Sequence, residues 1–142
     1  MKWHELAEQQ CSVARSLAVI GDRWTLLVIR DLMLGRSRFK DFAASPEGIP
    51  TNLLSDRLAR LVDAGVAEKV PAAAGSKRLA YRLTAKGEAL RPVLVAIREW
   101  GLEWEHGTQV RRVESPRGTS TPEAPARSIP LSAPLAVPEP ES

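Results

Sequence analysis

The sequence is poor in cysteine and aromatic residues and has no long apolar run, and each shortage excludes a class of protein. Cys11 is the one cysteine among 142 residues, so no disulfide can form within the chain. Cys11 and two distant histidines, His4 and His106, do not make a ligand set for zinc. No stretch approaches the ~20 apolar residues of a membrane span, and the first ten residues lack the apolar run of a signal peptide. We therefore expect a cytoplasmic protein without metal, cofactor or membrane contact.

Proline and charge divide the chain near residue 111. Residues 112–142 hold seven of the eleven prolines and no aromatic residue, a composition that disfavours helix, strand and core alike. The same segment has a net charge of −1, which leaves a net charge of +4 on residues 1–111. We predict a folded domain over 1–111 and a disordered Pro-rich tail over 112–142, with a docking segment that folds on a partner as the alternative. A basic domain favours an anionic partner.

Apolar residues recur at helical spacing in four segments before residue 65. The segments are residues 12–20, 22–35, 38–44 and 51–64, of which three end at a glycine. Asp22 and Ser37 are the expected N-caps of the second and third helices, and Phe39 and Phe42 are expected to point inward. Residues 45–50, rich in proline and glycine, predict a turn before the fourth helix.

After residue 65 the spacing of apolar residues changes from the helical period of 3.6 residues to the strand period of 2 residues. Residues 66–70 and 79–83 alternate, which places Leu79, Tyr81 and Leu83 on one face of a hairpin with a long loop, residues 71–78. Thr84 is the expected cap of a final long helix that reaches Trp104. The order predicts a mostly α protein with a small β-hairpin (α+β), a winged helix-turn-helix with terminal helices.

The segment 51–64 has the properties of a DNA-recognition helix. Three of its four leucines, Leu54, Leu58 and Leu61, fall within ~60° on a helical wheel and predict a buried stripe. A helix of ~10–12 Å diameter fits the ~12 Å major groove, where asparagine reads adenine and arginine reads guanine, and a helix N-terminus attracts a phosphate. The alternative is an ordinary amphipathic surface helix. The residues expected to contact DNA are Thr51, Asn52, Ser55, Asp56 and Arg60.

Basic residues cluster where a helix docked in the groove needs contacts to the phosphate backbone. One group surrounds the start of the third helix, and another lies at the tip of the long loop, where Gly75 gives freedom to bend. Solvated surface charge is the alternative, above all for Lys40 and Arg23. The residues expected to contact phosphates are Arg36, Arg38, Lys40, Lys77 and Arg78.

Three runs carry a family resemblance: CSVARSLAVIGDRWTLLVIRDLMLGRSRFKDF, GIPTNLLSDRLARLVDAGV and YRLTAKGEAL. Together they cover about residues 11–101, and the chain resembles the HxlR-type transcriptional regulators, a winged-helix group related to MarR. The resemblance implies a homodimeric repressor or activator that binds double-stranded DNA at a pseudo-palindromic operator. Two features depart from the family. Pro50 stands where a capping Ser or Thr is frequent, which makes Thr51 the expected first residue of the helix, and the tail has no family counterpart.

Three of the four tryptophans lie near the ends of the predicted domain, which suggests a surface that needs a partner. A twofold dimer through the terminal helices would set two recognition helices about one DNA turn (~34 Å) apart. The resemblance also implies dimerisation through terminal helices. The alternative is that these tryptophans cover the core of a monomer. The residues expected at the dimer interface are Trp3, Ile97, Trp100 and Trp104.

Cys11 stands where the first predicted helix begins, with Arg15 one turn away. A helix N-terminus and a nearby cation both increase the reactivity of a thiol. Some HxlR-type proteins use a cysteine near this position as a sensor, so the resemblance implies a redox or electrophile switch. A small buried thiol is the alternative.

Neither a catalytic nor a phosphate-binding motif stands out, so we do not expect an enzyme. The competing interpretation is a winged-helix protein-interaction module, or a ligand-sensing adaptor without its own operator. A small-molecule or oxidant inducer remains part of the main hypothesis, with a site between the dimer helices and the DNA-binding lobe.

Overall fold

The computed structural model describes residues 2–110, apart from the side chain of Trp3. The predicted tail, residues 112–142, lies outside the described residues. Within them no helix is both long and apolar enough to cross a membrane. The elements in chain order are α1 (Trp3–Ala7), α2 (Ser12–Ile20), α3 (Thr25–Met33), α4 (Phe39–Ala43), α5 (Thr51–Asp63), β1 (Ala67–Pro71), β2 (Leu79–Leu83), α6 (Ala85–Glu88) and α7 (Arg91–Trp104). The predicted fold class, mostly α with a small hairpin, is confirmed.

The described residues fall into two compact units, 2–94 and 95–110, with the boundary inside α7. The first unit contains α1 to α6, the hairpin and the first turn of α7. The described part of the second unit is the remainder of α7 and the segment as far as residue 110.

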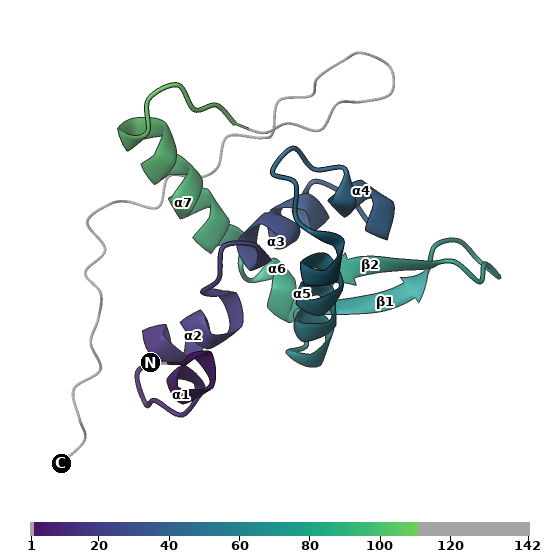
Figure 1. The fold of residues 1–142 in the computed structure, drawn as a ribbon, viewed down its shortest axis with the longest axis horizontal. Helices are drawn as coiled ribbons and strands as arrows, with labels where there is room; N and C mark the ends of the chain where they lie inside the picture. Colours follow the sequence, from purple (N-terminus) through teal and green to yellow (C-terminus); the bar gives the residue numbers. More distant parts are fainter. Residues whose placement is uncertain (1, 111–142) are drawn as a thin grey trace. The chain divides into compact units, whose positions relative to one another are not determined.

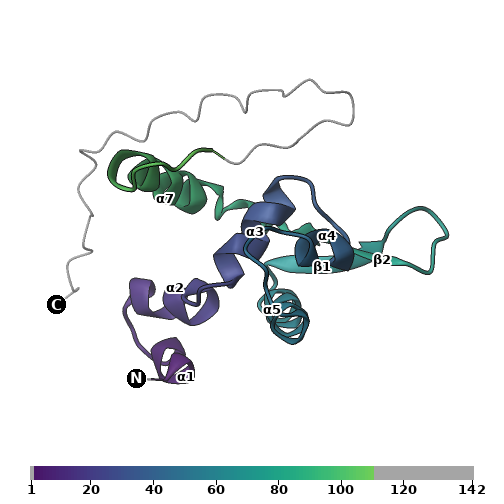
Figure 2. The ribbon, with the colours of Figure 1, turned by 45° about the horizontal axis from the view of Figure 1, so that its top comes forward.

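The core of the first unit lies where α3, α4, α5 and the hairpin meet. Helix α5 packs against α3, α4 and β1, as the ribbons in Figures 1 and 2 show. The predicted leucine stripe is confirmed, because each of its three side chains is at most 1% exposed. The largest fully buried side chains are Phe42, Ile29, Leu54, Leu58, Leu61 and Val66.

The two strands pair antiparallel, with Ala67 opposite Leu83 and Pro71 opposite Leu79. The backbone N–H of Tyr81 donates to the carbonyl of Ser37 at 2.7 Å, which ties the hairpin to the segment before α4. Tyr81 and Leu83 pack on the core as their shared face predicts, but Leu79 is 55% exposed. Leu79 is exposed because it lies at the loop end of the hairpin, which projects beyond the helices in Figure 1.

Caps and inward-facing residues follow the sequence prediction in part. The Asp22 carboxylate accepts the N–H groups of Trp24 and Thr25 at 2.9 and 3.1 Å, but the N-cap of α3 is Trp24, so Asp22 lies two residues before the N-cap position predicted for it. Ser37 is likewise not the N-cap of α4. Arg38 takes that position, and its N–H donates to the Asp41 carboxylate at 3.1 Å.

Phe42 is buried as predicted, whereas Phe39 is 37% exposed and the prediction for it is wrong. Helix α4 has only five residues, and its core-facing side is formed by Phe42 and Ala43. Phe39, at the first position of the helix, therefore lies at the rim of the core.

The prediction of a single long C-terminal helix is also wrong, because the chain forms two helices, α6 and α7, in its place. Thr84 caps only α6, where its Oγ1 accepts the Gly87 N–H at 3.2 Å. Pro92 explains the interruption, since proline lacks an N–H and clashes with the carbonyl four residues earlier. Helix α1, which precedes all the predicted elements, was not expected.

Candidate nucleic-acid interface

Helix α5 presents a polar edge to solvent. Its leucine stripe faces the core, so the remaining side faces outward, and the five side chains predicted to contact DNA are all exposed there. The side chains of Asp56 and Arg60 are 46% and 48% exposed. Thr51 is the first residue of the helix and Pro50 precedes it, as the sequence suggested. The edge therefore offers hydroxyl, amide and guanidinium groups, with the unpaired N–H groups of a helix N-terminus beside them.

The turn before α5 is fixed by a small polar network on α3. The Arg30 guanidinium donates to both carboxylate oxygens of Glu47, at 2.7 and 3.0 Å, and lies 3.0 Å from the carboxylate of Asp31. Asp31 is 2% exposed and accepts a hydrogen bond from the Ser45 hydroxyl. Burying a carboxylate is costly unless it is paired, so these contacts make the position of the turn specific.

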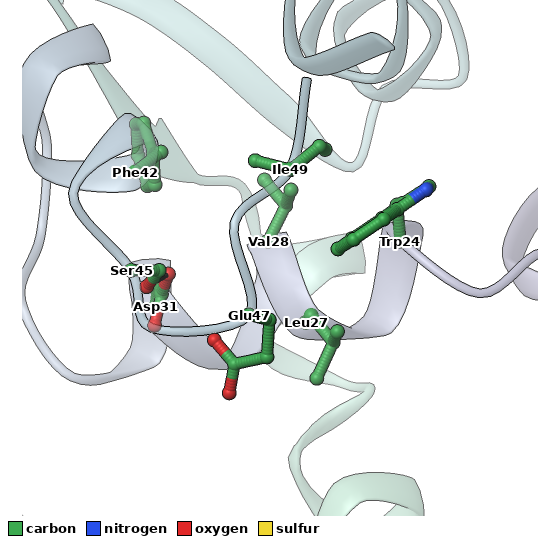
Figure 3. A pocket seen from close by; sticks show the side chains of 8 residues that line it. All are labelled: Trp24, Leu27, Val28, Asp31, Phe42, Ser45, Glu47 and Ile49. Atoms are coloured by element: carbon green, nitrogen blue, oxygen red, sulfur yellow. Dashed lines mark hydrogen bonds between the residues drawn. The ribbon is translucent and has the colours of Figure 1, made fainter. Parts of the chain in front are cut away.

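The same network borders a small pocket, drawn in Figure 3, in which Asp31 and Ser45 meet at one side and apolar residues of α3 lie at the other. Its volume is about 10 Å³, space for about one water molecule. Ligand pockets usually have roughly 300–1,000 Å³. This pocket therefore does not hold a small-molecule inducer.

The C-terminal end of α5 is closed by a left-handed glycine. Gly65 has φ +72°, its N–H donates to the carbonyl of Val62 at 3.0 Å, and the N–H of Val66 donates to the carbonyl of Leu61 at 2.9 Å. This is a Schellman motif, in which a side chain with a Cβ would be strained at the glycine position.

Residues of the YRLTAKG run hold this end of α5 from outside. Thr84 Oγ1 donates to the backbone carbonyls of Gly65 and Val66, and Lys86 Nζ donates to the carbonyl of Ala64 at 2.7 Å. Gly87 lies so close that a Cβ built on it would be 2.1 Å from the carbonyl oxygen of Val66. The sequence indicated Thr84 only as a cap, and no role was predicted for the other two residues.

Arg57 holds the middle of α5, and sequence reasoning missed it. Its side chain is 14% exposed, and its Nε donates to Asp22 Oδ1 at 3.0 Å, which joins α5 to the segment before α3. Burial opposes the ionisation of Asp22, but hydrogen bonds from the Thr25 hydroxyl, the backbone N–H groups and Arg57 outweigh burial and hold the pKa of Asp22 below its ordinary value. The only available signal was that both residues belong to the quoted family runs.

The predicted phosphate-contacting residues are in different environments. Lys40, Lys77 and Arg78 are exposed, the last two in the hairpin loop on the side that leads into β2 rather than at its tip. Arg38 is half-buried. Arg36 is also half-buried, and its guanidinium lies 3.9 Å from the Asp31 carboxylate and 3.5 Å from the Asp41 carbonyl oxygen. Arg36 is thus held against the protein, whereas the other cations reach solvent more freely.

The hairpin loop has a defined backbone. The Ala72 N–H donates to the Arg78 carbonyl at 2.8 Å, the Arg78 N–H donates to Ser76 Oγ at 3.1 Å, and Gly75 has φ +74°. These bonds continue the hairpin by one pair, so Arg78 lies at the base of the loop and Lys77 next to it, both exposed.

The described terminal helices expose large apolar side chains. On α7 in the second unit, Ile97, Trp100 and Trp104 are 48%, 60% and 63% exposed. On α2 in the first unit, Val13 and Leu17 are 62% and 47% exposed. Apolar surface of this kind in a single chain is typical of protein–protein interfaces.

Cys11 is the N-cap residue of α2 and its side chain is exposed. The alternative of a buried thiol is therefore wrong for this chain. The nearby Arg15 uses its Nε to donate to the carbonyl of Ala7 at 3.1 Å. Across the described residues, no three His, Cys, Asp or Glu side chains are grouped so as to hold a metal ion.

Comparison with known proteins places the chain in a family. Residues 19–109 match the HxlR-like helix-turn-helix family. The uncharacterised HTH-type transcriptional regulator Rv3095 of Mycobacterium tuberculosis is 41% identical over 93 residues, which are 66% of this chain and 58% of that protein. This chain therefore spans less than two thirds of that relative's length.

Solved structures agree with this assignment. The crystal structure of PA1607, described as a candidate transcription factor, is 43% identical, with a TM-score of 0.69 over 87% of this chain and 88% of that one. The redox regulator HypR in its reduced form is 26% identical, with a TM-score of 0.59 over 66% of this chain and 92% of that one. The protein thus belongs to the HxlR-like helix-turn-helix family, which consists of transcriptional regulators rather than enzymes.

Proposed function

We propose that the protein is a sequence-specific DNA-binding regulator that acts as a homodimer on a pseudo-palindromic operator. The observation that carries the proposal is the polar edge of α5, exposed while its leucine stripe is buried. In the major groove this edge would place Asn52, Ser55 and Arg60 against base edges, with Asp56 beside Arg60 and with Thr51 and the helix N-terminus near a phosphate. Such a regulator would work beside the chromosome, in the cytoplasm.

The hairpin loop would hold the adjoining backbone. Lys77 and Arg78 are exposed on a loop that projects beyond the helices (Figure 1), and Lys40 and Arg38 supply further cations near α4. Arg36 would contribute less, since its guanidinium already contacts Asp31 and Asp41. An adaptor without its own operator would not require exposed cations at both the hairpin loop and α4, so this distribution favours DNA.

The exposed side chains of α7 supply the dimer surface in this proposal. Ile97, Trp100 and Trp104 leave about half or more of their surface open in the single chain, and a twofold contact would bury them. Trp3 belongs to the same proposed interface. Two recognition helices would then be about 34 Å apart, one turn of DNA. Light scattering at micromolar concentration tests this step, and a monomer would refute the two-half-site arrangement.

Regulation by oxidants or electrophiles would act through Cys11. The thiol is exposed at the beginning of α2, and one structural relative is a redox regulator by name. Oxidation or alkylation there would change DNA affinity by altering the N-terminal helices.

The decisive experiment is selection of duplexes from a random library, followed by gel shifts with the selected sequence. We expect Arg60→Ala to cost about 1–3 kcal/mol and to relax one base position. Lys77→Ala/Arg78→Ala should weaken all sequences alike and reduce the slope of log K against log salt by ~0.9 for each lost phosphate contact. If no sequence is enriched, the proposal fails. If Arg60→Ala, like the loop variant, loses only salt-dependent affinity that is the same for every sequence, then Arg60 does not read a base.

A further inference from the structure

Four charged side chains form a continuous series from the segment before α3 to the exposed edge of α5. Asp22 Oδ1 accepts Arg57 Nε at 3.0 Å, Arg57 Nη1 contacts Asp56 Oδ2, and the same Asp56 oxygen lies 3.0 Å from Arg60 Nε. We call this series, Asp22–Arg57–Asp56–Arg60, the α5 relay. Its inner member Arg57 is 14% exposed and its outer member Arg60 is 48% exposed, so it leads from the protein towards solvent.

Asp56 is an unexpected residue at the edge of a helix that would face DNA, because a carboxylate repels phosphates and accepts hydrogen bonds from few base edges. Here its charge lies between two guanidinium groups, so little of it is left to repel DNA. Asp63 provides a comparison within the same helix. It is seven residues further on, about 20° away at 100° per residue, and is exposed, but it forms no ion pair with any described residue.

We propose that the α5 relay fixes the guanidinium of Arg60 and thereby determines how strictly the protein distinguishes one base of its operator. An arginine side chain has many rotamers, and ordering it on binding reduces affinity. A carboxylate that already restrains Arg60 lowers this cost at a matching guanine and keeps the guanidinium from following phosphates at other sequences. Asp56 is then a positioning residue rather than a reader of bases, and Arg57 holds Asp56 in place. This inference rests on the proposed function.

The test compares two neutralised carboxylates of α5, Asp56→Asn and the matched control Asp63→Asn. Both remove one negative charge from the same exposed side of the helix, but only the first removes the restraint on Arg60. Each variant is measured against the selected duplex, against single-base variants of it and against an unrelated duplex at one salt concentration. Arg57→Lys tests the inner part of the relay, since a lysine reaches Asp22 as a point charge but does not bridge Asp22 and Asp56 as a guanidinium does.

We expect Asp63→Asn to raise affinity for all duplexes by the same factor. Asp56→Asn should reduce the ratio of specific to non-specific affinity about tenfold, the scale of one base contact. The lost preference should lie at the base position that Arg60→Ala affects. Adding Asp56→Asn to Arg60→Ala should reduce that preference no further, although it should raise affinity for all duplexes as Asp63→Asn does. Asp56→Glu should restore most of the preference, and Arg57→Lys should weaken the same position.

Equal effects of Asp56→Asn and Asp63→Asn would overturn the relay, because charge alone would then explain both. A loss of preference spread over several base positions would overturn it as well. If the wild-type protein enriches no sequence, the proposed function fails and the relay fails with it. If the wild-type protein is sequence-specific and Asp56→Asn leaves the ratio of specific to non-specific affinity unchanged, the relay alone is contradicted. Thermal unfolding of each variant checks that the fold is retained.

Discussion

The close contact between Gly87 and the Val66 carbonyl, just before β1, allows a prediction in which helix propensity and packing act in opposite directions on stability. Gly87 lies in α6, is buried and does not have a left-handed backbone. Replacing a helical glycine by alanine normally stabilises by up to about 1 kcal/mol. At Gly87, however, the new Cβ would lie 2.1 Å from the Val66 carbonyl oxygen and 2.8 Å from Leu83 Cδ2. A backbone carbonyl cannot rotate away as a side chain can, so α6 itself must move.

The expected size follows from what that movement breaks. Overpacking costs about 1–3 kcal/mol. Displacement of α6 also weakens the cap that Thr84 Oγ1 provides to Gly87, worth about 1 kcal/mol. When the gain in helix propensity is subtracted from these two costs, Gly87→Ala should lower the free energy of unfolding by about 2 kcal/mol. For a domain of this size the melting temperature should fall by roughly 10 °C.

Urea unfolding followed by far-ultraviolet circular dichroism measures the difference, with all variants at one protein concentration because the proposed dimer would unfold in a concentration-dependent way. Gly101→Ala is the matched control, since Gly101 is a helical glycine of α7 with no heavy atom within 4 Å of its Cβ position. This control should be as stable as the wild type or up to about 1 kcal/mol more stable. A Gly87→Ala protein that gains stability as Gly101→Ala does would refute the packing argument.

Three further predictions concern the start of α3, the dimer and the thiol. Asp22→Asn should destabilise by about 1–2 kcal/mol at pH 7, because the carboxylate accepts two backbone N–H groups at the start of α3 and holds Arg57. Because the pKa of Asp22 is lowered in the folded protein, the carboxylate stabilises the fold fully above pH 3.8, its ordinary pKa, and loses this effect as the pH falls from there towards the lowered pKa. The difference in free energy of unfolding between Asp22→Asn and the wild type should therefore be smaller in urea unfolding at pH 3 than at pH 7. Trp100→Glu should give a monomer in light scattering, since it places a charge on the exposed apolar side of α7, while Lys77→Ala should remain a dimer. Cys11→Ser should abolish any effect of diamide on DNA affinity, and an unchanged response would exclude the thiol as sensor.

Periodicity made most of the recognition unit predictable. The leucines of α5 recur every three or four residues and are buried, and the strands of the hairpin alternate and pair. Such patterns are local consequences of burying one face of a regular element. The C-terminal break was harder to predict because Leu90, Val93 and Leu94 continue the helical pattern across it. Pro92 was the one signal against a continuous helix. It interrupts the helix because proline has no N–H to donate to the carbonyl four residues earlier, and regularly spaced apolar side chains do not replace that hydrogen bond.

Contacts between distant residues could not be predicted in the same way. Arg57 stands between two core leucines and looks like any polar residue of α5, and its partner Asp22 is 35 residues away. The five-residue α1 is too short to show a period. Only a three-dimensional arrangement identifies which polar residues meet, because ion pairs leave no regular spacing in the sequence.

The polar contacts of α5 fix the rotation of the helix about its own axis, which its hydrophobic packing leaves open. A leucine stripe fixes which side of a helix is buried, but burial energy depends on area and tolerates small rotations about the helix axis. Hydrogen bonds and ion pairs are directional, so they restrict such rotations. In this protein they act before the helix, at its middle and after it, and a rotation of one residue step would exchange the side chains on the edge that we propose to contact DNA. The runs that mark the family each supply one of these contacts, through Asp31, Asp22, Arg57, Thr84 and Lys86.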